Sequence, residues 1–77
     1  MFCKKLNEYL NMLCCSGREF SELSGISEAT VSRYKSGARM PKANSEDMKR
    51  LCRGIYTLAR QKGFENISYK NILQELN

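Results

Sequence analysis

Residues 17–36, GREFSELSGISEATVSRYKS, decide the fold of this chain, because their types meet the demands of two short helices joined by a tight corner. Gly25 lies where the chain must leave the first helix, and glycine adopts positive φ there at almost no steric cost. Ile26 is expected to fill the corner from inside. Ser27 is a good N-cap for a helix that begins near Glu28. The spacing is therefore that of a helix-turn-helix.

Apolar and small residues follow the inner side of this predicted helix pair. Three side chains are expected to point onto one small core: Phe20, Val31 and Tyr34. Ser21 is compact enough to let the second helix approach. Ser16 followed by Glu19 fits a capping box, so the first helix of the pair is expected to start around residue 17 or 18. Both helices then have defined ends.

The run SGISEATVSRYKSGARMP at residues 24–41 resembles the helix-turn-helix domains of phage repressors and Cro proteins, an XRE-like family. The similarity covers nearly the whole chain. It implies an all-α fold, a compact lambda-repressor-like bundle of about five helices in which the second and third form the motif. It also implies a basic Gly-x-Arg-x-Pro loop after the motif. Residues 29–33 resemble the lactose-repressor headpiece as well, but there the motif opens the chain, whereas here a complete helix precedes it.

Two positions depart from the phage repressor pattern. Members of that family often carry a glutamine at the first position of the motif, where it holds a phosphate, and this chain has Gly17. That role is therefore not carried over to Gly17. Either Arg18 or Ser16 takes over the phosphate contact, or the contact is absent. The usual alanine of the family is Ser21 here, which is a milder change.

The resemblance implies that the helix near residues 28–36 enters the DNA major groove, where phosphate contacts position the protein and base contacts specify the site. Four exposed residues are expected to contact base edges: Glu28, Ala29, Thr30 and Arg33. Six are expected to contact phosphates: Ser27, Ser32, Lys35, Ser36, Arg39 and Lys42. For Arg33, a phosphate contact or an ion pair with Glu28 stays an open alternative. The direction of Lys35 depends on the helix phase, and the Tyr34 hydroxyl could reach a phosphate.

The charge distribution agrees with a polyanionic partner. The formal net charge is +5, and residues 33–42 contain four basic side chains and no acidic one. Together with this charge, the resemblance implies a transcriptional regulator of the repressor kind that binds double-stranded DNA sequence-specifically. One recognition helix contacts only a few base pairs, so a homodimer on a repeated half-site is expected. The alternative is a helical protein-interaction module that holds an acidic partner through its last helix or basic loop.

Helical spacing of apolar residues predicts the rest of the bundle. Residues near 2–15 form one amphipathic helix, with Phe2, Leu6, Leu10, Leu13 and Cys14 on its apolar stripe. Ser45 caps a long helix whose buried face carries Met48, Leu51, Cys52, Ile55, Leu58 and Ala59, and Gly63 ends it. Ser68 caps a last helix with an apolar edge of Ile72, Leu73 and Leu76. That edge folds back on the core, pairs with a second subunit, or continues into further residues.

The length of 77 residues suits one domain, 1–77, which could be the N-terminal domain of a longer regulator. The chain has no histidine, and its four cysteines show no C-x-x-C spacing, so neither a metal nor another cofactor is expected. Cys14 and Cys52 are expected in the core, whereas Cys3 and Cys15 are candidates for exposure and a redox role. No catalytic constellation, small-molecule substrate, export segment or membrane span is evident, and a cytoplasmic location is expected.

Overall fold

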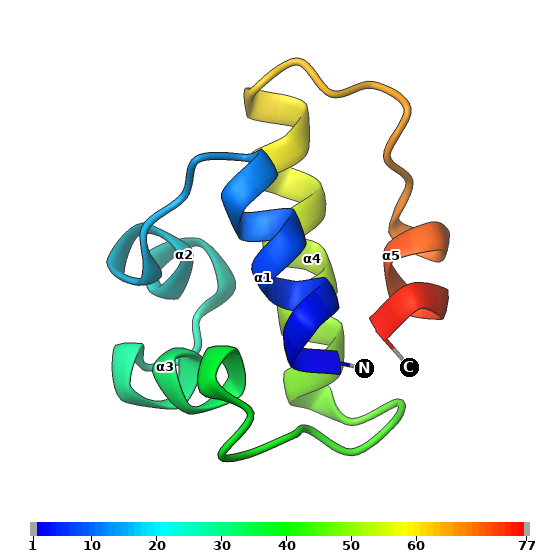
Figure 1. The fold of residues 1–77 in the computed structure, drawn as a ribbon. Helices are drawn as coiled ribbons and strands as arrows, with labels where there is room; N and C mark the ends of the chain where they lie inside the picture. Colours follow the sequence, from blue (N-terminus) through cyan, green and yellow to red (C-terminus); the bar gives the residue numbers. More distant parts are fainter. Residues whose placement is uncertain (1, 77) are drawn as a thin grey trace.

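The structure, a computed structural model, describes residues 2–76 and shows five α-helices (Figure 1). They are α1 (Phe2–Met12), α2 (Gly17–Ser24), α3 (Glu28–Ser36), α4 (Glu46–Gln61) and α5 (Tyr69–Leu76). No strand occurs among these residues. The predicted compact all-α bundle of about five helices, with the second and third forming a helix-turn-helix, is thus confirmed for the described part of the chain.

The longest helix, α4, runs through the whole molecule. It begins at the end where α3 lies and finishes at the opposite end (Figure 1). Both α2 and α5 pack against α4, while α1 packs against α3 and α5. The helix-turn-helix is therefore supported on one side by α4, through α2, and on the other side by α1, through α3.

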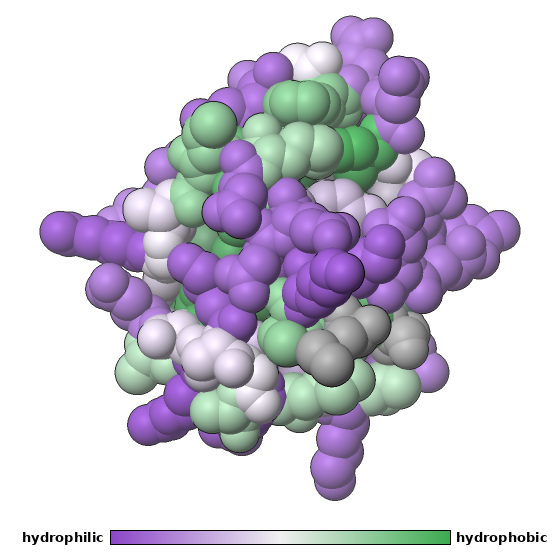
Figure 2. All heavy atoms as spheres, in the orientation of Figure 1, coloured by the Kyte–Doolittle hydropathy of each residue, from purple (hydrophilic) through white to green (hydrophobic). Residues whose placement is uncertain are grey.

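Apolar side chains from all five helices meet in one core. Leu6 of α1, Phe20 of α2, Ile55 of α4 and Ile72 of α5 are all fully buried. Leu76 is 1% exposed, so the apolar edge of the last helix folds back on the core of its own chain. The face drawn in Figure 2 is mostly polar, with the most hydrophobic side chains near its upper end and less hydrophobic ones along its lower edge. No helix within residues 2–76 is both long enough and apolar enough to cross a bilayer.

Gly54 allows α2 to pack closely against α4. A Cβ atom added at Gly54 would lie 3.0 Å from Cε1 of Phe20 and 3.1 Å from Cβ of Ser24. Phe20 has no exposed surface, and Cβ of Ser24 moves only with the backbone of α2, so neither neighbour can yield easily. The position of α2, and with it the helix-turn-helix, depends on the missing side chain at Gly54.

The first helix is shorter than the sequence predicts. It ends at Met12 instead of near residue 15, and Cys14 adopts φ 53° and is exposed. The assignment of Cys14 to the core was therefore wrong. The apolar spacing of the sequence extends one turn beyond the actual end of α1. The chain turns there so that Ser16 can cap α2, and in this turn the amide of Cys15 donates to the carbonyl of Leu10 at 3.0 Å. Of the other cysteines, Cys52 is buried as expected, and Cys3 and Cys15 are half-buried.

Replacing Gly54 with valine is expected to destabilise the protein by about 2 kcal/mol, because overpacking at a closed helix contact usually costs ~1–3 kcal/mol. Urea unfolding measures the change. Lys49→Val, at an exposed position of the same helix, is the control for the helix propensity of valine. Equal losses in the two variants would contradict the close packing of α2 on α4.

Candidate nucleic-acid interface

The corner between α2 and α3 has the predicted geometry. Gly25 adopts φ 76°, and Ile26 is 4% exposed inside the turn. The hydroxyl of Ser21 donates to the carbonyl of Ile26 at 2.5 Å, and the hydroxyl of Ser24 accepts from the amide of Ile26 at 3.2 Å. Both polar groups of the buried Ile26 backbone are therefore satisfied by side chains of α2, which fixes the turn.

The start of α3 is capped by Ser27. Its hydroxyl accepts from the amide of Thr30 at 3.3 Å and donates to the hydroxyl of Thr30 at 2.8 Å. The predicted N-cap is thus confirmed. The same bonds engage both hydroxyls within the cap, and Thr30 is half-buried.

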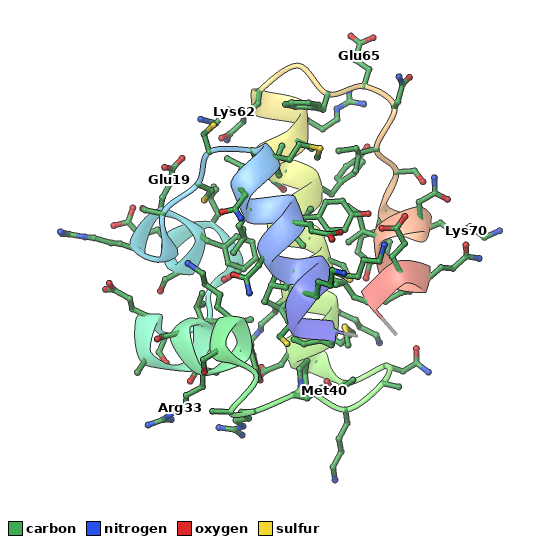
Figure 3. All side chains as sticks on the ribbon, in the orientation of Figure 1. Glu19, Arg33, Met40, Lys62, Glu65 and Lys70 are labelled. Atoms are coloured by element: carbon green, nitrogen blue, oxygen red, sulfur yellow. The ribbon has the colours of Figure 1, made fainter. Side chains whose placement is uncertain are left out.

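One face of α3 is exposed along its length. It carries five of the ten predicted contact residues: Glu28, Ala29, Ser32, Arg33 and Ser36. The opposite face, with Val31 and Tyr34, is buried in the core. Arg33 extends away from the body of the protein at the end of the molecule opposite Lys62 (Figure 3). The structure therefore gathers these predicted residues on a single accessible ridge.

Lys35 lies on one flank of that ridge. With Gly17, Glu28, Ser32 and Ser36, it lines a hollow between the start of α2 and α3. This settles the direction that the sequence left open. Cations of the following loop, Arg39 and Lys42, are exposed and line a second hollow on the other flank, toward the start of α4.

The loop after α3 turns sharply and is anchored to the helix. Gly37 adopts φ 82°, and the amide of Arg39 donates to the carbonyl of Arg33 at 3.3 Å. The hydroxyl of Ser36 donates to that same carbonyl at 3.1 Å and accepts from the amide of Ala38 at 3.3 Å. Ser36 therefore also works as a local cap, besides lying on the exposed face.

Asn7 of α1 holds the C-terminal end of α3. Its Nδ2 donates to the carbonyl of Lys35 at 2.7 Å and to the carbonyl of Cys3 at 2.9 Å. The carbonyls of the last helical turn lack partners within the helix, so this bond satisfies one of them. The role of Asn7 was not predicted from the sequence, because nothing in the local pattern of α1 indicates a partner 28 residues away.

The side chain of Tyr34 joins α3 to the start of α4. Its hydroxyl donates to Oδ2 of Asp47 at 2.6 Å, and its ring meets the ring of Phe2 edge-on, with centroids 6.1 Å apart. Burial and the Asp47 carboxylate raise the pKa of Tyr34 to about 12. Tyr34 is thus a core residue, as expected, and its hydroxyl bonds to Asp47.

The cations beside α3 make no ion pair within residues 2–76. The ion pairs found there join Lys5 to Glu8, Arg18 to Glu22, and both Arg50 and Arg53 to Glu46. The predicted alternative of a pair between Arg33 and Glu28 is thus not formed. The positive charge of Arg33, Lys35, Arg39 and Lys42 remains available to an anion.

The cysteines form no ligand cluster in the described part of the chain, where no three Cys, Asp or Glu side chains come together as metal ligands would. Burial raises the pKa of the Cys52 thiol to about 11. Burial, followed by the charge of Glu19, also raises the pKa of Cys15.

Comparison of the chain with protein-family models, with curated proteins and with solved structures found no match. The relation to phage repressor and Cro domains stays a prediction that rests on the residues quoted above.

Replacing Asn7 with alanine is expected to loosen the end of α3 and to lower the free energy of unfolding by about 1 kcal/mol, the usual net value of one hydrogen bond. Asn11→Ala, an exposed asparagine on the same helix, is the matched control. Hydrogen exchange should show faster exchange in the last turn of α3 for Asn7→Ala alone. Unchanged protection there would show that Asn7 does not hold the helix.

The stability conferred by the Tyr34–Asp47 bond should decrease at alkaline pH. Folding raises the pKa of Tyr34 from 10.0 to about 12. The contribution of the Tyr34–Asp47 bond to the free energy of unfolding is therefore complete below pH 10.0 and is lost as the pH rises through about 12. The stability difference between the wild type and Tyr34→Phe should therefore shrink by about 1–2 kcal/mol over this range. Denaturant unfolding at several pH values measures it, and a constant difference would contradict the assignment.

Proposed function

We propose that this protein binds double-stranded DNA sequence-specifically, as a transcriptional regulator of the repressor kind, with α3 in the major groove. One observation carries the proposal: the exposed ridge of α3 is flanked on both sides by cations without ion-pair partners in residues 2–76. A major groove about 12 Å wide has a phosphate strand on each side. Such a groove matches a ridge with charge on both flanks.

The flanking cations divide the phosphate contacts between the two strands. Lys35 lies on the α2 side of the ridge, and Arg39 and Lys42 lie on the loop side. The hydroxyl of Ser32 can add a neutral contact along the ridge, whereas the hydroxyl of Ser27 donates its proton to Thr30. Since phosphate contacts set the register of a protein on DNA, this arrangement would orient α3 before any base is contacted.

The ridge itself supplies the base contacts. Arg33 can donate two hydrogen bonds to one guanine edge, which discriminates by about 1–3 kcal/mol against a wrong base. Glu28 can accept from a cytosine amino group, and Ala29 or the methyl group of Thr30 can meet a thymine methyl. Arg33 is the residue on which most of the specificity is expected to depend.

We further propose that the protein binds DNA as a homodimer and is located in the cytoplasm. One α3 contacts too few base pairs to select a site in a genome, whereas two subunits double the contacted sequence. The two half-sites are expected about one helical turn, ~34 Å, apart. A footprint limited to one half-site, with no dimer on the DNA, would contradict this part of the proposal.

Charge reversal tests the proposed interface. Arg33→Glu with Arg39→Glu should lower DNA affinity about a hundredfold, because two contacts of ~1–3 kcal/mol are lost and repulsion is added. The slope of affinity against salt should fall by about 1 for each phosphate contact removed. Lys62→Glu with Lys70→Glu is the control of equal charge, since both lysines project far from Arg33 (Figure 3).

Fluorescence anisotropy with labelled duplex DNA measures both quantities, after circular dichroism has shown that the variants fold. Equal losses in the two double variants would mean that net charge alone attracts DNA. Unchanged affinity of the Arg33 and Arg39 variant would show that α3 is not part of the DNA interface.

A further inference from the structure

A second group of cations lies on α4 and has no part in the proposed DNA contact. We call it the basic stripe, and it consists of Lys49, Arg50, Arg53 and Arg60. All four are exposed, and at 3.6 residues per turn they fall on one side of the helix, opposite the buried face. The stripe carries as many cations as the surroundings of α3.

The stability of the protein explains Arg60, which lies in the last turn of α4 with its Cζ 5.8 Å from the centroid of the Tyr56 ring. It does not explain Lys49, Arg50 and Arg53. Lys49 and Arg53 are four residues apart, and Arg50 and Arg53 three, so like charges are neighbours on the helix surface and weaken it. Glu46 is the one carboxylate paired with the stripe within residues 2–76, with Oε1 at 3.8 Å from Arg50 Nε and 3.4 Å from Arg53 Nη2. Exposed pairs of this kind contribute little to stability.

A hollow lies beside the stripe, between α2 and α4. Arg50, Arg53 and Thr57 line it from α4, and Leu23 and Ser24 line it from α2. Leu23 is half-buried and packs against the core, so the hollow has an apolar part next to two guanidinium groups. This combination suits a ligand with both an apolar side chain and carboxylates.

The stripe leads away from the proposed DNA contact. The Tyr34–Asp47 bond fixes the start of α4 beside α3, and from there α4 runs to the other end of the molecule (Figure 1). A helix of 16 residues is about 24 Å long. Arg60, near its far end, therefore lies well away from a duplex bound along α3. The Arg60 end of the stripe can therefore be occupied while α3 is on DNA, whereas Arg50 and Arg53 lie within two turns of the end of α4 that is next to α3.

We infer that the basic stripe and the hollow beside it bind an acidic segment of a partner protein. Glu46 shows the chemistry: one carboxylate oxygen already lies between the guanidinium groups of Arg50 and Arg53, and a partner carboxylate can take or share that place. An apolar side chain of the segment covers Leu23. A nucleic-acid strand fits less well, because strand-binding surfaces offer aromatic rings for stacking and this hollow is lined by none.

Titration of the full chain with a short synthetic peptide tests the inference. The peptide carries glutamates, and its leucines are spaced so that they lie on one face of a helix. The amide chemical shifts of the protein report where the peptide binds. Shifts are expected at Leu23, Ser24, Thr57 and the basic stripe. Affinity should fall about tenfold in Arg50→Ala with Arg53→Ala, since two charge-assisted contacts are lost. It should not change in Lys4→Ala with Lys5→Ala, which removes the same charge from α1.

The first titration contains no DNA, so its outcome is independent of the proposed function. Shifts at α3 and its loop instead of α4, equal losses in the two variants, or no saturable shift would each overturn the inference. A second titration adds excess duplex DNA. Peptide that stays on α4 supports a separate protein-binding surface, whereas peptide displaced from α4 by DNA would show that the stripe binds nucleic acid and would also overturn it.

Discussion

The turn at Gly25 is the constraint on which the rest of this structure depends. Gly25 adopts φ 76°, a conformation that other residues adopt only with strain, and it lets the chain reverse within three residues. Ile26 can then enter the core while its backbone bonds to Ser21 and Ser24. Because these contacts set the direction in which α3 leaves the turn, they also determine which face of α3 stays exposed.

Contacts from distant parts of the chain then hold α3 in place. Asn7 binds its C-terminal end from α1, and Tyr34 binds Asp47 at the start of α4. The absence of a side chain at Gly54 lets α2 pack closely against α4. The exposed ridge is thus connected to three other helices, and a rigid ridge presents its side chains to a groove at a lower cost in conformational entropy than a mobile one.

Local signals in the sequence were enough for most of the fold. Ser16, Ser27 and Ser45 cap their helices as predicted, because N-caps depend on residues within one turn. The exposed ridge of α3 follows from the same helical spacing. The end of α1, the direction of Lys35 and the roles of Asn7 and Asp47 could not be predicted, since each depends on tertiary packing. The common face of the basic stripe follows from helical spacing, but the hollow beside it could not be predicted, because it depends on how α2 packs on α4.

The central proposal is that α3 recognises duplex DNA sequence-specifically. The most direct measurement is binding of the protein to random-sequence duplex DNA over a series of salt concentrations, followed by sequencing of the retained fraction. The account predicts retention that weakens steeply with salt and enriches a motif repeated with two-fold symmetry. No retention at low salt, or retention without any enriched sequence, would contradict it.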